Sequence, residues 1–509
     1  MLCKVSSMGF LGLNSYKVLV EVDVSVGLPT FELVGLADTA VKESRERVRT
    51  SLRNCGYEFP TGRVIINLAP ADVKKMGPLY DLPILLGILS ASGQLKANFK
   101  DCCFLGQLSL GGEVLRCFGI LPMVIKAKKI GFKKIFVPYE NLKEASVVKG
   151  IESYGVKNIE DIISFLKGNE ANILKGNFDG FNFSCEDFDV DFSEVKGQYL
   201  AKRALEIAAA GGHNLLLIGS PGAGKSMLAK RLPTILPKLN FDEAIEVTKI
   251  HSVAGKVSCK NPLITTRPFR SPHHTISTAG LSGGGNNVRP GELSMAHNGV
   301  LFLDELPEFK RDVKEILRQP MEDGEITLTR AAISVTYPCS CLVVAAMNPC
   351  PCGYFGHPTK KCSCSPARVE KYLAKVSGPL LDRLDIHVDV EPVEFSDLSS
   401  VANEEPSVNI RARVEKARSL QRDRYKNFNF SQNSKLYGAA LKQFCILSSS
   451  AKRLLEDVFK KFGMSARAYD KILKVSRTIA DLDGEQLIKD SHVAEAVQYR
   501  TMDRKYWRN

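Results

Sequence analysis

The residues with the clearest chemical potential form a glycine-rich loop that follows an apolar run and precedes a helical segment. Leu215–Ile218 are apolar in succession, as expected of a buried strand. Glycines in such a loop allow backbone N–H groups to converge on phosphates at a helix N-terminus, where the helix dipole also favours negative charge. The loop predicts a nucleotide-phosphate site and consists of Gly219, Ser220, Pro221, Gly222, Ala223, Gly224, Lys225 and Ser226.

Two side chains of this loop are expected to work with two carboxylates that lie further along the chain. Lys225 is expected to reach the β- and γ-phosphates of ATP, and Ser226 is expected to ligate Mg²⁺. A second apolar run, Val300–Leu303, ends in Asp304 and Glu305. We expect Asp304 to hold the Mg²⁺ shell, directly or through water, and Glu305 to orient and polarise the attacking water. The second carboxylate favours a hydrolase over a protein that only binds nucleotide.

Three further polar residues fit the same chemistry. Asn348 ends another apolar strand, where its amide can position the lytic water opposite Glu305. Arg383 follows this strand, and Arg467 lies at the start of a later helix. An arginine supplied by a neighbouring subunit can stabilise the charge that develops on the γ-phosphate. For each arginine the alternative is a surface salt bridge.

A cysteine cluster lies just after Asn348. Cys350 and Cys352 form one Cys-x-Cys pair, and Cys362 and Cys364 form a second. Four thiolates can bind zinc tetrahedrally, although this spacing is tighter than the usual C-x₂₋₄-C, and His357 is an alternative ligand. Because four protein ligands leave no open position, a zinc ion here would be structural rather than catalytic, and free buried thiols are the alternative.

These residues need a scaffold, and the pattern of the chain predicts an α/β fold in several parts. Residues 1–166 are predicted to form an α/β domain, since segments such as Val20–Val26 alternate with period two. Residues 167–194 are predicted to be an acidic linker. Residues 195–392 alternate between strands and helices, which predicts a parallel-sheet core. Helical periodicity dominates residues 393–509, which are predicted to form a helical lid.

Length and composition restrict the class of protein. A chain of 509 residues is expected to contain about two to four domains. The formal net charge of +13 favours a polyanionic partner such as nucleic acid, although charge alone does not decide it. No apolar run approaches the about 18 residues needed to cross a bilayer, and the first residues lack a signal-peptide pattern, so a cytoplasmic protein without membrane contact is expected. In that compartment the 14 cysteines are not expected to form disulfides.

Taken in order, the motifs resemble the ComM/YifB group of magnesium-chelatase-related AAA+ proteins. The resemblance covers nearly the whole chain, and it also includes the segments 195–198, 267–274, 289–292, 319–324, 381–383 and 465–467. It implies a homo-hexameric ring with active sites between subunits, in which Arg383 corresponds to the trans-acting finger and Arg467 to the second sensor. It further implies a helicase-like motor on single-stranded or branched DNA that promotes branch migration in natural transformation, together with recombination proteins.

Some residues give local support to a DNA motor. The interval between Ser226 and Asp304 is long and contains the flexible segment Gly283–Gly285, which resembles the extra pore hairpin of related helicases. Residues 325–336 suggest a second hairpin, with Arg330 near its tip. Such an arginine can follow phosphates without reading sequence. The alternative is that both hairpins are structural ribbons.

The first domain resembles the Lon-protease-like (ribosomal S5 domain 2-like) domain of this family. Lon enzymes use a serine after Gly-Pro and a distant lysine, whereas here Gly77-Pro78 is followed by Leu79–Asp81, and the lysine region, Phe118–Pro122, presents an apolar residue. The domain is therefore predicted to be non-proteolytic. Two alternatives to a DNA motor stay open: a magnesium-chelatase-type ATPase chaperone, and a remodeller of proteins.

Overall fold

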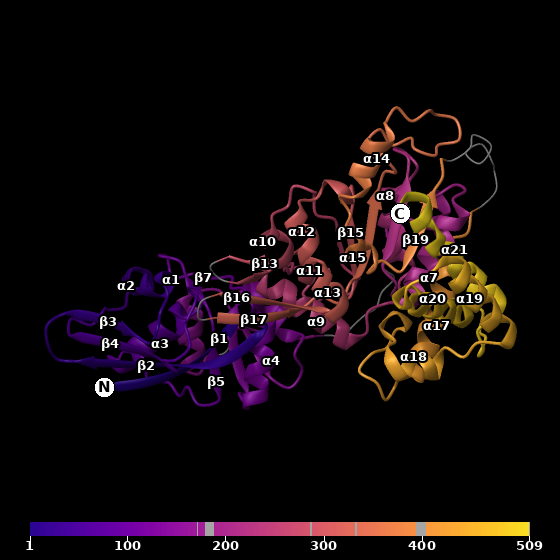
Figure 1. Cartoon of the computed structure of the whole chain (residues 1–509). Coiled ribbons are helices and arrows are strands. Elements are labelled where there is room, and N and C mark those ends of the chain that lie inside the picture. The colour runs from indigo at the N-terminus through magenta and orange to yellow at the C-terminus, as the bar shows by residue number, and fades with distance from the viewer. Residues whose placement is uncertain (170–171, 179–187, 286–287, 331–332, 393–403, 508–509) are drawn as a thin grey trace.

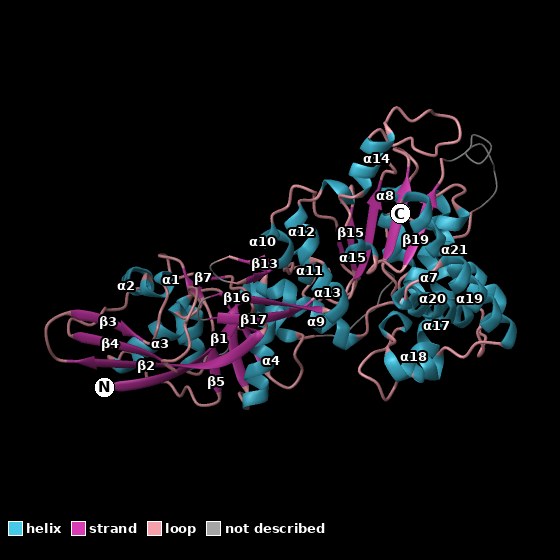
Figure 2. Ribbon diagram, viewed as in Figure 1, coloured by secondary structure: helices cyan, strands magenta, loops and turns pink. Residues whose placement is uncertain are grey.

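The structure is a computed structural model that describes residues 1–169, 172–178, 188–285, 288–330, 333–392 and 404–507. The molecule is elongated, with the N-terminal strands at one end and the C-terminal helices at the other (Figure 1). Helices and strands alternate through the middle of the chain, whereas the last part of the chain is helical (Figure 2). The predicted α/β class with a helical C-terminal region is confirmed.

The N-terminal part contains two four-stranded sheets. The first has the order β1–β2–β4–β3 and consists of β1 (Leu2–Leu11), β2 (Asn14–Ser25), β4 (Arg63–Ala69) and β3 (Thr30–Val34). The second has the order β10–β9–β8–β5 and consists of β10 (Leu174–Lys175), β9 (Glu152–Val156), β8 (Lys134–Pro138) and β5 (Cys102–Phe104). Strand β10 lies in the predicted linker, of which residues 170–171 and 179–187 are outside the described residues.

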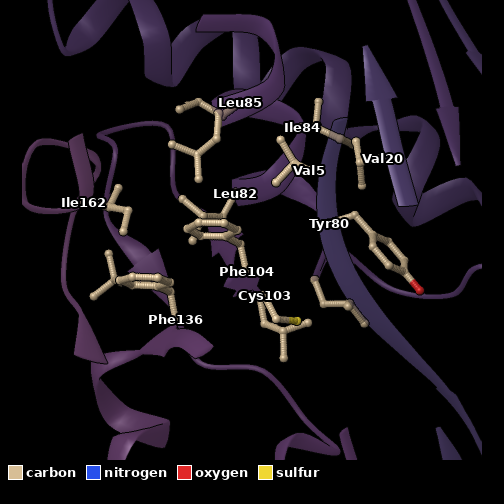
Figure 3. Packing of buried hydrophobic residues seen from close by; sticks show 14 of the residues in the cluster. Val5, Val20, Tyr80, Leu82, Ile84, Leu85, Cys103, Phe104, Phe136 and Ile162 are labelled. Carbon is tan, nitrogen blue, oxygen red and sulfur yellow. The ribbon is translucent and has the colours of Figure 1, made fainter. Parts of the chain in front are cut away.

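A helix that is apolar on nearly all sides joins these sheets. Helix α3 (Asp81–Ala91) contacts β1 and β2, and its Leu82 lies beside Phe104 in the buried cluster shown in Figure 3. The rings of Phe104 and Phe136 stack with centroids 4.8 Å apart. Burial on all sides explains why this helix lacks a polar face. The remaining elements are α1 (Thr39–Lys42), α2 (Ser44–Asn54), β6 (Gln107–Leu108), β7 (Val114–Leu115), α4 (Ile120–Ile130), η1 (Tyr139–Asn141), α5 (Leu142–Ser146) and α6 (Ile159–Leu166).

The central part is built on a five-stranded sheet in which every neighbouring pair is parallel. Its order is β12 (Phe269–Arg270), β15 (Val300–Leu303), β18 (Leu342–Met347), β11 (Leu215–Gly219) and β19 (Ile386–Val390). Nearly every residue of the three inner strands is buried, as expected of a parallel sheet covered on both faces. The helices that precede and follow the phosphate loop in the chain are η2 (Phe192–Glu194), α7 (Tyr199–Gly211), α8 (Lys225–Ile235) and α9 (Phe241–Val253).

Both expected hairpins are present in this central part. The first pairs β13 (Gly283–Gly284) with β14 (Arg289–Pro290), and the second pairs β16 (Glu325–Arg330) with β17 (Ile333–Pro338). Their tips, residues 286–287 and 331–332, are outside the described residues. The surrounding elements are α10 (Thr278–Ser282), α11 (Glu292–Met295), η3 (Leu306–Glu308), α12 (Arg311–Ile316), α13 (Arg318–Asp323), α14 (Pro366–Leu373) and α15 (Gly378–Leu381).

The C-terminal helices share their hydrophobic core with the central sheet. Ile472 and Ile479 belong to the same buried cluster as Leu215 and Val388 of the sheet. The predicted boundary between core and lid, at residue 393, falls on residues 393–403, which are outside the described residues. The helices are α17 (Ser407–Arg424), η4 (Asn433–Lys435), α18 (Gly438–Phe444), α19 (Ser449–Phe462), α20 (Ala466–Leu482) and α21 (Asp490–Tyr506).

The N-terminal part docks on α9 of the central part. The Gly119 N–H donates to the carbonyl of Ser252 at 3.0 Å. The buried Glu144 carboxylate accepts hydrogen bonds from the Leu121 N–H, at 3.0 Å, and from the Ser252 hydroxyl. These bonds join α4 and α5 to the end of α9, so the two parts meet through specific polar contacts.

No helix within the described part of the chain is long and apolar enough to span a bilayer.

Candidate nucleotide-hydrolysis site

The glycine-rich loop connects the buried strand β11 to helix α8, as predicted. Gly222 and Gly224 have φ angles of 79° and 93°, which lie in the left-handed region that favours glycine. Helix α8 begins at Lys225, directly after Gly224. The loop therefore ends at a helix N-terminus, where free N–H groups and the helix dipole favour an anion.

The Lys225 ammonium joins this loop to the end of β18. It donates to the carbonyl oxygens of Gly219, at 2.7 Å, and Ser220, at 2.9 Å, and to Asn348 Oδ1 at 3.1 Å. Burial lowers the pKa of Lys225, and the negative charges of the neighbouring carboxylates oppose this shift. The lysine and the asparagine, which are far apart in sequence, are thus direct neighbours.

The carboxylate of Asp304 lies on the other side of the loop. Ser226 Oγ donates to Asp304 Oδ2 at 2.7 Å, and the Glu305 N–H donates to Asp304 Oδ1 at 3.0 Å. A hydroxyl and a carboxylate oxygen side by side fit the preference of Mg²⁺ for oxygen ligands. Five predicted residues therefore meet at the carboxyl edge of the sheet, as the sequence predicted. They are Lys225, Ser226, Asp304, Glu305 and Asn348.

One contact of the site was not predicted. His274 Nδ1 lies 3.2 Å from Glu305 Oε2, and the His273 ring lies 4.0 Å from that of His274. His274 follows β12, and β12 pairs with β15, which delivers Glu305. The motif of residues 267–274 was visible in the sequence, but only the order of the strands reveals that it ends beside the carboxylate.

Helix α14 contributes a second group of residues that the sequence did not single out. A cavity of about 460 Å³ is lined by Glu305 and Asn348 together with Arg368, Lys371 and Tyr372 of α14. Arg368 and Lys371 are exposed. The space beside the two predicted catalytic side chains therefore has a basic wall.

Arg383 and Arg467 lie at the opposite edge of the sheet. Asn214, which immediately precedes β11, donates through Nδ2 to the Arg383 carbonyl at 3.2 Å. The Arg383 guanidinium pairs with Glu322 at 2.7 Å, and Arg467 lies 3.8 Å from Asp382 with 76% of its side chain exposed. Because the five residues of β11 span about 16 Å, neither arginine is near the phosphate loop of its own chain.

The four cysteines converge as the spacing suggested. Cys350 Sγ lies 3.3 Å from Cys352 Sγ and 3.6 Å from Cys362 Sγ, and all four sulfur atoms, including that of Cys364, lie within 4.8 Å of one another. In tetrahedral zinc sites, Zn–S bonds of about 2.3 Å place sulfurs about 3.8 Å apart, so this donor set fits zinc. His357 is outside the cluster, and its Nδ1 accepts a hydrogen bond from the Thr359 N–H at 3.1 Å.

In the N-terminal part, Asp81 lies three residues after Pro78 of the Gly-Pro pair. Its buried carboxylate accepts hydrogen bonds from Arg47 Nε at 2.7 Å, Arg47 Nη2 at 3.0 Å and the Leu108 N–H at 3.1 Å. Burial raises the pKa of Asp81, while the bonds from Arg47 oppose the shift. This carboxylate is thus held in a buried ion pair that joins α2 to α3.

Comparison with known proteins places the whole chain in one family. Three family models match successive segments of the chain. The model "Subunit ChlI of Mg-chelatase" matches residues 20–141, and the model "Magnesium chelatase, subunit ChlI" matches residues 191–398. The model "Magnesium chelatase, subunit ChlI C-terminal" matches residues 404–500. The competence protein ComM of Haemophilus influenzae is 42% identical over 98% of this chain and 97% of its own length. YifB of Escherichia coli is 42% identical with the same coverage. Lon protease 2 of Bacillus subtilis is 28% identical over 31% of this chain and 32% of its own. With nearly full-length matches to ComM and YifB and three successive chelatase segments, the chain belongs to the ComM/YifB family of magnesium-chelatase-related AAA+ proteins.

Proposed function

We propose that the chain is an ATP-hydrolysing motor that acts on single-stranded or branched DNA as a hexameric ring and promotes branch migration during recombination. The observation that carries the ATPase proposal is the meeting of Lys225, Ser226, Asp304, Glu305 and Asn348 at one edge of the sheet. This arrangement combines a phosphate-binding loop with two carboxylates and an amide that can act on water.

Each residue has a separate task in this proposal. When bound, ATP supplies the bond to be cleaved, and Mg²⁺ supplies the positive charge that neutralises the phosphate oxygens. Lys225 binds the β- and γ-phosphates, while Ser226 and Asp304 hold the metal ion. Glu305 accepts a proton from the attacking water, and Asn348 orients that water.

The positions of the two arginines support the assembly of several copies. Arg383 and Arg467 lie about one strand length from the phosphate loop of their own chain. They can reach a γ-phosphate only if a second copy presents its nucleotide to this edge. We therefore assign both to the site of a neighbouring subunit, where a guanidinium stabilises the developing charge.

The net charge, the hairpins and the similarity to ComM support DNA as the substrate of the proposed motor. The formal net charge of +13 attracts a polyanion. The β16–β17 hairpin carries Arg330, a residue suited to phosphate contacts. ComM of H. influenzae, to which the chain is similar over nearly its whole length, is named a competence protein. Recombination proteins are accordingly proposed as partners.

The cysteine cluster is proposed to bind one structural zinc ion. Cys350, Cys352, Cys362 and Cys364 would hold it with four thiolates, leaving no position for a substrate. The ion would close the loop between Asn348 and α14. The N-terminal part is proposed to be non-proteolytic, because Leu79 follows its Gly77-Pro78 pair where Lon enzymes use a serine, and the lysine region also presents an apolar residue.

The experiment that tests the proposed function is ATP hydrolysis with no DNA, single-stranded DNA and forked DNA, using wild-type protein and Lys225→Ala. Strong stimulation by DNA that is lost in Lys225→Ala supports a DNA motor, and branch migration is then assayed on a mobile junction. Hydrolysis that is indifferent to every DNA contradicts the motor. Because the matching segments are named for magnesium chelatase, that result would favour a chelatase-type chaperone or a protein remodeller.

A further inference from the structure

A buried charged network lies at the arginine edge of the sheet and has no part in the chemistry described so far. Asp385, immediately before β19, is 9% exposed. One of its carboxylate oxygens lies 3.3 Å from Lys471 Nζ, and the other lies 3.1 Å from His213 Nδ1. His213 Nε2 in turn lies 2.8 Å from the Thr478 hydroxyl. Lys471 and Thr478 are both on α20, so one carboxylate connects to this helix at two points.

The contacts of the network favour an ionised Asp385. Burial by itself would raise the pKa of Asp385, but Lys471 and His213 outweigh it and hold this pKa well below its usual range. Burial lowers the pKa of Lys471, and Asp385 opposes the shift. A buried ion pair of this kind is costly to break, because removing one partner leaves the other charge without compensation.

Arg383 and Arg467, which we assign to a neighbouring subunit's site, are joined through this network. Arg383 lies two residues before Asp385, on the segment that enters β19. Arg467 lies one helical turn before Lys471 on α20. The Lys471 ammonium also donates to the Leu384 carbonyl at 3.2 Å, directly between Arg383 and Asp385. The helix that carries one arginine is therefore tied to the segment that carries the other.

A cavity beside the network indicates what the joined edge can receive. It has a volume of about 360 Å³, and its lining includes more lysines and arginines than carboxylates, with Arg383, Arg422, Lys435 and Lys474 among them. Such a lining favours a phosphate-bearing group. This edge faces away from the phosphate loop of the same chain, so the group would belong to another copy.

We propose that Lys471 and Asp385 are positioning residues that hold Arg383 and Arg467 as one unit, so that a neighbouring subunit's nucleotide meets both arginines together. The proposal rests on the proposed function, because it requires arginines that act between copies. Lys471 does not touch the phosphates in this scheme. It fixes the angle between α20 and the segment before β19, and a small displacement of a catalytic group is sufficient to slow a reaction strongly.

The test uses rings of two variants that are made together by co-expression with different tags. Lys471→Met is expected to lower kcat for ATP hydrolysis by about tenfold to hundredfold, with little change in KM, because its own phosphate loop stays intact. Lys225→Ala is inactive but keeps its arginine edge. Mixed rings of the two are expected to hydrolyse ATP faster than either homogeneous ring, since Lys225→Ala subunits supply intact arginines to Lys471→Met subunits.

Matched variants separate positioning from general destabilisation. Arg203→Met removes another ion pair between the core and the last helices, with Glu495 at 3.0 Å, and is expected to keep wild-type kcat. Lys471→Arg, which preserves the charge, is expected to retain most activity. If Lys471→Met does not fold, Thr478→Val removes the second connection of α20 and replaces it in the mixing test.

The outcomes are distinct. Wild-type kcat in Lys471→Met, or an impaired variant that mixing does not restore, overturns the positioning role. Rings of Arg383→Ala mixed with Lys225→Ala provide the parallel test of the proposed function. If that pair regains activity while the Lys471→Met pair does not, the proposed function stands and the positioning role fails. If neither pair regains activity, arginines acting between subunits are excluded, and both proposals fail.

Discussion

The side chains at the carboxyl edge of the central sheet form a chain of direct contacts. Lys225 reaches Asn348, Ser226 reaches Asp304, and Asp304 accepts a bond from the backbone of Glu305. The backbone of Glu305 has a φ of 53°, a left-handed conformation that is uncommon for a residue with a side chain. Such strain is retained where the position of a side chain matters, which agrees with a catalytic role for this carboxylate.

Glu305→Gln is expected to separate nucleotide binding from hydrolysis. The amide keeps the shape of the side chain but cannot accept the proton of the attacking water, so kcat should fall by about a hundredfold or more. Binding of a fluorescent ATP analogue should stay near the wild-type level, because Lys225 and Ser226 are unchanged. A variant that hydrolyses ATP at the wild-type rate would remove Glu305 from the mechanism.

Asp385 is expected to make the central part sensitive to acid. Its folded pKa lies below the unfolded value of about 3.9, so its contribution to stability is present above that value and is lost as the pH falls below it. Asp385→Asn should therefore have a lower urea midpoint at pH 7, and its midpoint should fall less than that of the wild type between pH 5 and pH 3.

The single tryptophan provides the measurement for this prediction. Trp507 donates to the Leu373 carbonyl at 3.2 Å, so its fluorescence reports unfolding of the central part. Asp457→Asn, an exposed position on α19, is the control and should have the acid response of the wild type. If the urea midpoints of Asp385→Asn and wild type fall in parallel with pH, the ion pair of Asp385 does not contribute to the acid sensitivity of the fold.

At the scale of elements, the sequence predicted features formed by contiguous residues. It did not predict contacts that depend on the order of the strands in the sheet. The phosphate loop is recognisable because its glycines, lysine and flanking apolar run are contiguous. The pairing of His274 with Glu305 was not predictable, because it requires β12 to lie beside β15. The placement of Arg383 at the opposite edge of the sheet also depends on the order of the strands. Strand β10, in the predicted linker, is two residues long and pairs with the preceding strand, β9.

The loop between β18 and α14 is expected to depend on a metal ion. Purified protein should contain about one zinc ion per chain by elemental analysis, and Cys362→Ser should lower this content and the ATPase rate together, because the loop links Asn348 to α14. Cys259→Ser changes an exposed cysteine outside the cluster and is the control. Zinc-free wild-type protein with full activity would contradict a structural ion.

The β16–β17 hairpin is expected to contact the DNA backbone. Arg330→Ala should weaken binding to single-stranded DNA similarly for all sequences and reduce the slope of log K against log salt by about 0.7, because one phosphate contact is lost. Fluorescence anisotropy over a range of salt concentrations measures both effects. Arg53→Ala, on an exposed part of α2, is the control, and an equal slope in both variants would argue against a DNA contact at the hairpin.

At the scale of the whole molecule, the phosphate loop and the arginine edge lie at opposite ends of the strands of one parallel sheet. In the proposed function, a single chain therefore carries two halves of an active site that cannot meet each other. Repetition of a contact between unlike surfaces closes into a ring if the rotation permits. In such a ring, the proposed function makes hydrolysis in one subunit dependent on the placement of the next.

ATP is expected to stabilise this assembly. Glu305→Gln with ATP and Mg²⁺ should form hexamers at concentrations where the nucleotide-free protein is smaller, because the bound γ-phosphate connects adjacent copies through Arg383 and Arg467. Mass photometry measures the distribution. Arg383→Ala combined with Glu305→Gln should shift it back toward smaller species. A distribution that does not respond to ATP would contradict a nucleotide bridge between subunits.

The contact between the N-terminal part and α9 has a consequence for how the family can diversify. Helix α9 follows α8, which begins at Lys225, and its last turn is bonded to Gly119 and Glu144. Glu144 and Ser252 lie far apart in sequence, yet a change in one alters the partner of the other. A chimera that joins the N-terminal part of one relative to the ATPase of another should therefore fold well only if the end of α9 is inherited with the N-terminal part.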